Sequence, residues 1–334
     1  MSILYSNAII SVRSGRMLNP DRIRRMIAAN TVADAAKILF ECGYNEQILT
    51  ETPWATDKII FSELERTLSE FRQLCKNDEL VYCVMARFFY HNAAALYNNQ
   101  VVENANGRSK DREATLAESL YPMDFEGISV ELLRSLISKR SYNSLPEPLQ
   151  VALAALDKME AATPQVVEVE INRALFTDLF ARLRRMRNRA ITNYFVASLD
   201  IQNMRTFAKV KMQGGRPDGL FIEGGRASEV ALMAIFERDP NYLRTALAGL
   251  GYDKLIDALC DGLYDADLTR FENLAGAFLV EMGRVDADDS FKLNMTFAWF
   301  IKKMEELRIV KIILMGKKFG RTKDELREEL RGVL

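Results

Sequence analysis

A similar polar segment occurs three times along this chain, at intervals of about 105 to 111 residues. Each follows an amphipathic stretch that we expect to form a helix ending at a polar turn, and the segments are Tyr90-His91-Asn92, Asp200-Ile201-Gln202-Asn203 and Glu306-Leu307-Arg308-Ile309. A repeat of this length corresponds to a whole structural unit and dictates the architecture. We therefore expect one helical unit used three times in a pseudo-threefold body, which suits the docking of partners better than catalysis.

Two alignments test the repeat position by position. When residues 43–44 are aligned with residues 251–252, which are Gly-Tyr in both copies, residues 26–42 and 234–250 align without a gap, and apolar side chains face apolar side chains. A second alignment, of position 203 with position 309, predicts that both helices stop at a glycine eleven residues later. The middle copy, around 128–156, aligns less well, and chance similarity between amphipathic helices remains an alternative.

The composition favours helices throughout. The chain holds only 8 prolines and 17 glycines, and Ala, Leu, Arg, Glu, Met and Lys predominate. Asn19 is expected to cap a helix that Pro20 opens, Thr31 to cap the next helix, and Gly43 to end it. We predict an all-α protein, with helices over residues 21–29, 32–41, 80–99, 130–138, 147–158, 164–186 and 188–211 and a long helix between 54 and 77.

Two polar, glycine-containing stretches mark candidate boundaries between the helical units. Residues 104–112 are expected to form an exposed loop, and residues 213–219 carry three glycines and a proline, which is typical of a turn. We therefore divide the chain into three helical subdomains, at residues 1–108, 109–215 and 216–334.

Charge and cysteine content restrict the partners and the compartment. Basic and acidic side chains number 45 and 46, so no overall field would concentrate nucleic acid or an acidic membrane. The cysteines lie in apolar helical stretches without metal-ligand spacing, which indicates buried thiols in a reducing compartment, and they are Cys42, Cys75, Cys83 and Cys260. The first residues lack the features of a signal peptide, and no apolar run approaches the ~20 residues that cross a bilayer.

The usual parts of an enzyme site are missing from the sequence. It holds one histidine, His91, and no dinucleotide fingerprint, Walker loop or metal-ligand pattern. His91 is interpreted as a hydrogen-bonded structural side chain rather than a general base. Adjacent carboxylates such as Asp288-Asp289 and Glu305-Glu306 point about 100° apart on a helix and cannot share a site. We expect no catalytic, cofactor-binding or metal-binding residue.

Two further patterns can each be interpreted either as structural or as functional. The glycine pairs at 214–215 and 224–225 could cradle a phosphate, but no strand precedes them, and a turn between subdomains is favoured. Basic residues cluster at 182–189 and again at 302–323. Either cluster could contact nucleic-acid phosphate, lipid headgroups or acidic protein, and acidic neighbours in the second cluster favour a protein surface.

The order and spacing of several motifs resemble the C subunit of bacterial and archaeal V/A-type rotary ATPases, the relative of the d subunit of eukaryotic V-ATPases. The opening Tyr5-Ser6-Asn7-Ala8, followed by Arg13, is similar to the start of that family. Phe89-Tyr90-His91-Asn92 and residues 194–205 are similar to its first and middle polar segments. Residues 303–317, KMEELRIVKIILMGK, match its ending most specifically. Phe89 stands where the family usually has Asp, and Lys311 where it usually has Arg, which loses the bidentate fork.

This resemblance implies a funnel-shaped, non-catalytic, all-helical protein of three similar subdomains without cofactors. It would lie on the cytoplasmic face of the membrane, peripheral to the rotor ring of proteolipid subunits, and receive the foot of the central stalk formed by the D and F subunits. The candidate residues for the stalk socket are Arg308, Lys311 and Lys317.

Three other functions remain open at the level of sequence. The chain could be a helical scaffold that docks acidic proteins outside a rotary motor, an RNA-binding protein that uses residues 182–189, or an enzyme with an unusual site. The sequence does not specify whether the motor transports protons or sodium ions.

Overall fold

Helices account for nearly all regular structure in the computed structural model, which describes residues 3–107, 109–159, 162–284 and 294–330. Within these ranges there is no β-strand, only an isolated bridge between Phe125 and Ile128. The all-α prediction is confirmed. The shorter helices are α1 (Ile3–Gly15), α2 (Pro20–Ala28), α3 (Val32–Lys37), the 3-10 helix η1 (Ile38–Cys42), α4 (Glu46–Glu51), α7 (Lys110–Ser119), α8 (Val130–Ser138), α9 (Glu147–Leu156), α12 (Glu229–Phe236), α13 (Tyr242–Ala246), α14 (Asp253–Asp265) and α17 (Lys323–Glu329).

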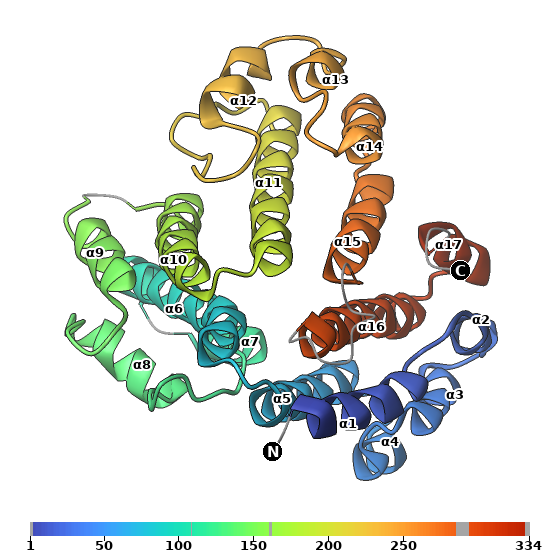
Figure 1. Ribbon diagram of the computed structural model, residues 1–334. Helices are drawn as coiled ribbons and strands as arrows, with labels where there is room; N and C mark the ends of the chain where they lie inside the picture. The colour runs from blue at the N-terminus through green and yellow to red at the C-terminus, as the bar shows by residue number, and fades with distance from the viewer. Residues whose placement is uncertain (1–2, 108, 160–161, 285–293, 331–334) are drawn as a thin grey trace.

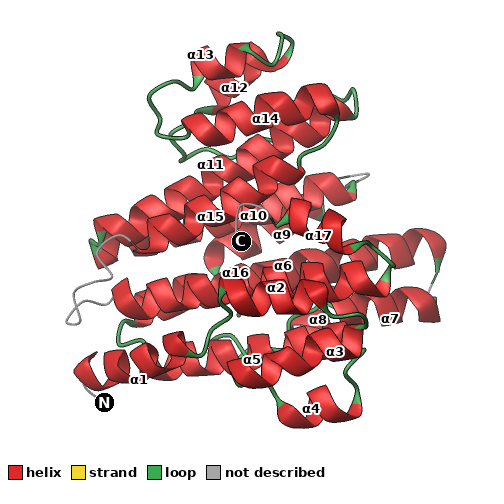
Figure 2. Ribbon diagram, turned by 90° about the vertical axis from the view of Figure 1, so that its right-hand side faces the viewer, coloured by secondary structure: helices red, strands yellow, loops and turns green. Residues whose placement is uncertain are grey.

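Six long helices form the inner part of the molecule. They are α5 (Thr56–Leu74), α6 (Asp78–Asn106), α10 (Pro164–Met186), α11 (Arg189–Met212), α15 (Thr269–Arg284) and α16 (Asn294–Lys318). The closest contacts among them are α6 with α10, α16 with both α5 and α15, and α11 with α15. Figure 1 shows these long helices around the middle of the molecule with the short helices outside them, and Figure 2 shows the long helices running in roughly one direction.

The predicted helix ends are confirmed by the hydrogen bonds at their caps. The Asn19 side chain accepts from the amide of Arg22, and Thr31 caps α3 in the same way. Gly43 adopts the left-handed conformation, with φ 75°, after η1. Gly214 and Gly320 follow the ends of α11 and α16 with φ 65° and 74°, as the second alignment predicted.

The prediction that the three polar segments form turns is wrong. Residues 90–92, 200–203 and 306–309 all lie in the interior of α6, α11 and α16. The buried polar side chains of these segments bond to partners far away in the sequence while the helices continue, and they are Asn92, Asp200, Asn203 and Glu306. The predicted exposed loop at 104–112 is also shorter than expected, because α6 runs to Asn106 and α7 begins at Lys110.

The buried apolar side chains form two clusters. One joins α1 to α10 and the first part of α11 with α16 and α17, so both ends of the described chain pack into the same core. The other is built from α11 to α15, and half-buried residues of α15 contact both. The subdomain boundaries at residues 108 and 215 stay a prediction.

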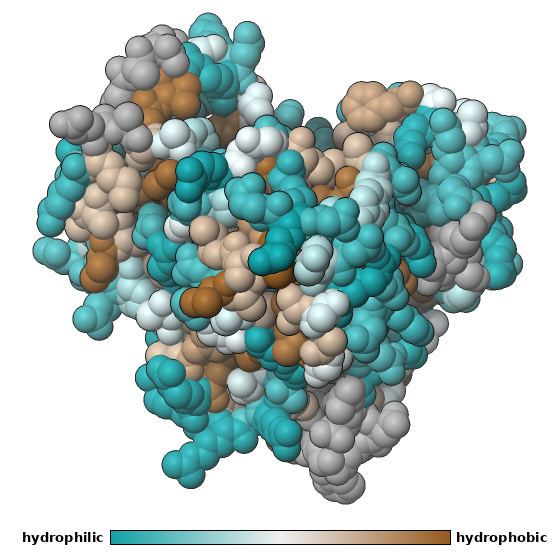
Figure 3. All heavy atoms as spheres, turned by 90° about the horizontal axis from the view of Figure 1, so that it is seen from above, coloured by the Kyte–Doolittle hydropathy of each residue, from teal (hydrophilic) through white to brown (hydrophobic). Residues whose placement is uncertain are grey.

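The surface carries apolar side chains in separate patches. Figure 3 shows brown patches interrupted by hydrophilic residues on the face seen from above. None of the helices in the described ranges combines the length and the apolar character that crossing a bilayer requires.

Candidate functional site

A buried carboxylate on α11 holds the chain segment that leads into α12. Asp200 is fully buried and accepts hydrogen bonds from the backbone amides of Arg226 and Ala227, at 3.0 and 2.9 Å. The hydroxyl of Tyr252 donates to the same carboxylate at 2.7 Å. Because a buried charge is stable only when donors surround it, these bonds fix the loop and Tyr252 against α11.

Glu306 on α16 has the corresponding role beside α2 and α3. Its carboxylate accepts from the Leu18 amide at 2.7 Å and from the Tyr44 hydroxyl at 2.8 Å. Tyr44 and Tyr252 are the residues that the first alignment paired, and each donates to a buried carboxylate. Burial, with Glu306 close by, holds the pKa of Tyr44 well above its usual value.

Two asparagines make a second repeated contact, one helical turn after the carboxylate position. Asn203 donates to the Ile222 carbonyl at 2.8 Å and accepts from the Ile222 amide at 2.9 Å. Asn92 on α6 makes the same pair of bonds with Tyr121, both at 2.8 Å. On α16 the aligned position holds Ile309, which is buried and has no side-chain amide.

The copy on α6 replaces the carboxylate with an aromatic contact. Phe89 stacks on Phe125 with ring centroids 4.4 Å apart, in a position that aligns with Asp200. The buried carboxylate of this region comes instead from Asp178 on α10, which accepts from the hydroxyls of Tyr82 and Tyr90 at 2.7 and 3.0 Å. Phe89 thus makes a ring contact at the position where the α11 copy has a hydrogen-bonded carboxylate.

A buried ionic network joins α5 to α16, and sequence reasoning missed it. Lys303 forms ion pairs with Glu63 and Glu306, and the three side chains are 4%, 1% and 2% exposed. The Lys303 ammonium also lies 4.6 Å from the centre of the Tyr44 ring. Glu63 could have been noticed because it follows Ile59 by four residues, on the apolar face of its helix.

The three predicted socket residues lie on the second half of α16 and have different surroundings. The Arg308 guanidinium pairs with Glu305 and donates to the Asn273 side chain at 3.1 Å. Lys317 donates to the carbonyls of Ile27 and Ala29 at 2.9 and 2.6 Å, and so caps the end of α2. Desolvation, with Lys323 nearby, lowers the pKa of Lys317. Lys311 is exposed.

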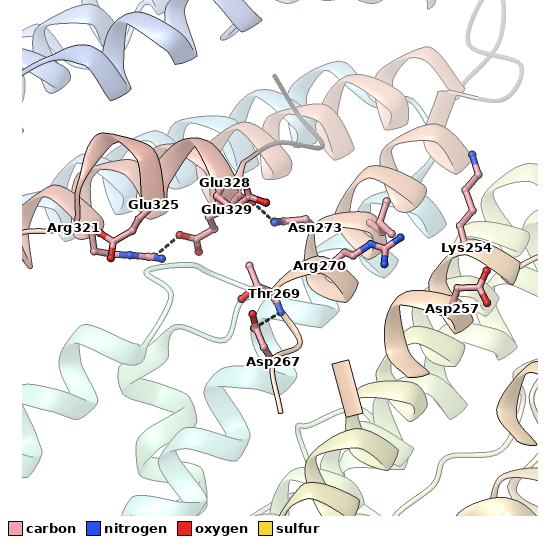
Figure 4. A pocket seen from close by; sticks show the side chains of 11 residues that line it. Lys254, Asp257, Asp267, Thr269, Arg270, Asn273, Arg321, Glu325, Glu328 and Glu329 are labelled. Carbon is pink, nitrogen blue, oxygen red and sulfur yellow. Dashed lines mark hydrogen bonds and ion pairs between the residues drawn. The ribbon is translucent and has the colours of Figure 1, made fainter. Parts of the chain in front are cut away.

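A cleft of about 600 Å³ lies between α14, α15 and α17. Figure 4 shows side chains of α17 on one side of the cleft and side chains of α14 and α15 on the other. Asn273 donates to the carbonyl of Glu329 and accepts from Arg308, so it links α15 to both α16 and α17. The lining is mostly charged, with Lys254, Asp257, Asp267, Thr269, Arg270, Asn273, Leu274, Arg321, Glu325, Glu328 and Glu329.

The potential nucleophiles of the described chain are not activated. Burial raises the pKa of Cys42 and of Cys83 to about 12 and that of Cys75 to about 11, so these thiols stay protonated near pH 7. Burial also raises the pKa of Cys260. The ring nitrogen Nε2 of His91 lies 3.1 Å from the carbonyl oxygen of Ser119, which fits the interpretation as a structural side chain.

The second glycine pair serves close packing against α11. A Cβ on Gly225 would overlap the carboxylate of Asp200, and Gly224 adopts a φ of 112° with the Phe180 ring beside it. The preference for a turn over a phosphate loop is consistent with this geometry. In the described ranges no group of three or more His, Cys, Asp or Glu side chains is arranged to hold a metal ion. The pair Asp288-Asp289 lies outside those ranges.

Comparison with known proteins covers almost the whole chain. Residues 6–329 match the model of the ATP synthase (C/AC39) subunit family. The C subunit of the V-type ATP synthase from one strain of Thermus thermophilus is 22% identical over 336 aligned positions, which span 98% of this chain and 97% of the relative. The protein of the same description from a second strain of Thermus thermophilus matches equally well.

Proposed function

The chain belongs to the ATP synthase (C/AC39) subunit family, and from this premise we propose that it is the non-catalytic adaptor of a rotary V/A-type ATPase. In this role it links the membrane rotor ring of proteolipid subunits to the D and F subunits of the central stalk. It lies on the cytoplasmic face, peripheral to the membrane, and transmits torque for ATP-coupled transport of protons or sodium ions. The proposed body is a funnel of three helical subdomains, with no nucleic acid among its partners.

The observation that carries the proposal is the match over residues 6–329, which coincides with a helical body whose two ends share one core. Torque transfer needs a part that deforms little, and close-packed helices meet that need. The pairing of α16 with α5 supports this, because it ties the C-terminal region to the N-terminal region.

The three socket candidates have different surroundings, so we expect one of them to contact the partner and two of them to support the fold. We assign the partner contact to Lys311, which is exposed. Lys317 and Arg308 hold α16 in place, because their charged groups bond to α2 and to α15 respectively.

Removal of this protein from the assembled complex tests the proposal. ATP hydrolysis by the catalytic head should continue, while ATP-driven ion uptake into sealed vesicles should be lost, because hydrolysis no longer turns the ring. Re-addition of the purified chain should restore uptake. Ion uptake at the full rate without this protein would contradict the adaptor role.

Variants separate the socket residues from the supporting ones. Lys311→Glu should weaken assembly with the stalk subunits and leave the melting temperature unchanged. Lys317→Ala should lower the melting temperature, because two carbonyls at the end of α2 lose their donor. Equal effects of both variants on stability would contradict this division.

A further inference from the structure

Five arginines lie within eight residues around the turn between α10 and α11, at 182, 184, 185, 187 and 189. Two of them form ion pairs with acidic side chains of the same chain. Arg182 and Arg185 both pair with Glu79 at the start of α6, at 3.0 and 2.9 Å. The other three, Arg184, Arg187 and Arg189, are exposed.

The helix dipoles account for the positions of only some of these three exposed arginines. Cations are favourable at the C-terminal end of a helix, which accounts for Arg184 and for Arg187 at the end of α10. Arg189 is the first residue of α11, where a positive charge opposes the helix dipole, and the first turn of α11 holds no acidic residue. In the described part of the chain, Arg184, Arg187 and Arg189 have no acidic partner, so exposed positive charge gathers around this turn.

The turn lies at an end of the long-helix layer. Tyr194, near the start of α11, contacts Phe297 near the start of α16, with ring centroids 4.9 Å apart. Phe300 contacts Phe71 near the end of α5, also at 4.9 Å. The turn thus lies near the end of the molecule where α5, α11 and α16 meet, and its three arginines are exposed in the described structure.

We propose that Arg184, Arg187 and Arg189 form a docking site for a carboxylate-rich segment of another protein of the rotary assembly. The inference rests on the proposed function, since it places a contact within the assembly at this end. Each guanidinium presents a planar fork that pairs with a carboxylate in bidentate fashion. Charge complementarity at such a site sets orientation and speeds association, and reversing the charge places like charges together, which lowers affinity.

The surroundings favour an acidic protein over a membrane. Stable binding to anionic lipid takes a second signal besides a few basic residues, such as an apolar group that inserts. Beside the arginines, Met186 and Ala190 are only half-exposed and Ile191 is buried, so the turn offers no such group. Nucleic acid is disfavoured by the net charge of −1 for the whole chain.

Zero-length cross-linking in the assembled complex tests the site. The variant Arg187→Lys keeps the charge and supplies an amine, which a carbodiimide joins to a carboxylate in direct contact as an amide. Mass spectrometry should find this amine linked to an Asp or Glu of another protein of the complex. A link to phospholipid only, to this chain only, or no link at all in a fully assembled complex would overturn the proposal.

Charge reversal provides an independent measurement. The triple variant Arg184→Glu, Arg187→Glu, Arg189→Glu should weaken binding to the complex stripped of this protein about tenfold or more, with reduced salt dependence. The matched control reverses exposed lysines outside both basic clusters, at Lys139, Lys158 and Lys209, with the same change in net charge. Equal affinities for the arginine variant and the unsubstituted chain would overturn the proposal.

The two proposals fail in different ways. If the unsubstituted chain does not join the stripped complex, the adaptor role itself is wrong. If it joins and restores ion uptake, and the arginine variant does so with unchanged affinity, only the docking site is wrong.

Discussion

At the scale of single residues, Asp200 shows how one side chain organises a loop and a tyrosine. Its carboxylate is fully buried and receives two backbone amides and one hydroxyl. The loop can approach so closely because Gly225 has no Cβ. Glu306 repeats the arrangement near the other end of the chain, with the Leu18 amide and Tyr44 as its donors.

Removal of the Asp200 carboxylate should be strongly destabilising. Asp200→Ala leaves three donors without an acceptor, two of them in buried bonds, and we expect it to lower the free energy of unfolding by about 3–5 kcal/mol. Urea unfolding followed by circular dichroism measures the change. Asp218→Ala is the control, because Asp218 is an exposed partner of Arg216 and its loss should change stability little. Similar losses for both variants would contradict the role of Asp200.

A methyl group at position 225 should also destabilise the fold. Gly225→Ala places a Cβ where the Asp200 carboxylate lies, so the loop or the carboxylate must shift, at a cost of about 2 kcal/mol or more. Gly15→Ala is the matched control, since nothing lies within 4 Å of a Cβ there and its φ is not positive. The control should stay within about 0.5 kcal/mol of the unsubstituted protein. A fully stable Gly225→Ala protein would show that the close approach is not needed.

At the scale of helices, the α5 and α16 pair is held by both apolar and ionic contacts. Phe71 packs against Phe300, and Lys303 bridges Glu63 and Glu306. Arg66, one turn along α5, adds a second cation beside Glu63. Removing the central cation while leaving the carboxylates is expected to be worse than removing the charges together.

The helix pair therefore offers a charge-balance prediction. Lys303→Met should lower the free energy of unfolding by about 3–5 kcal/mol, because two buried carboxylates lose the cation that both pair with. Adding Glu63→Gln to that variant should recover part of the loss. A double-mutant cycle from urea unfolding measures the coupling. Strictly additive losses would show that Lys303 and Glu63 do not stabilise each other.

At the scale of the whole molecule, buried tyrosines couple stability to alkaline pH. Burial, with a carboxylate nearby, raises the pKa values of Tyr44, Tyr82, Tyr90 and Tyr252 above the usual value. Below pH about 10 these tyrosines are protonated in both the folded and the unfolded chain, so their full contribution is present. Above that pH the unfolded chain loses protons first, and the contribution falls.

The urea midpoint should thus decline as the pH rises above about 10. Tyr252→Phe should lower the midpoint at pH 7, through loss of the bond to Asp200, and make the alkaline decline shallower. Tyr242→Phe, at an exposed ring, is the control and should change neither. An unchanged alkaline slope in Tyr252→Phe would contradict the linkage.

The local features of the fold were predictable from the sequence, and the interior of the long helices was not. Asn19, Thr31 and Gly43 act on backbone groups within five residues, so their roles follow from neighbouring letters. The segment at 200–203 was assigned to a turn because polar letters in an apolar stretch usually mark one. The same limit applies to the candidate site. The sequence shows that Lys317 is charged, but it does not show that this side chain donates to carbonyls at the end of α2.

The amino-acid order alone established that the chain is helical, where many helices begin and end, and which family it resembles, because these depend on local propensity and on the succession of motifs. Which polar residues are buried, and what they hold, emerged from the packed fold. The Leu18 amide that bonds to Glu306 is 288 residues away, and the donors to Asp200 are 26 to 52 residues away. A buried carboxylate is stable only where distant donors converge on it, and that convergence is a property of the packed molecule.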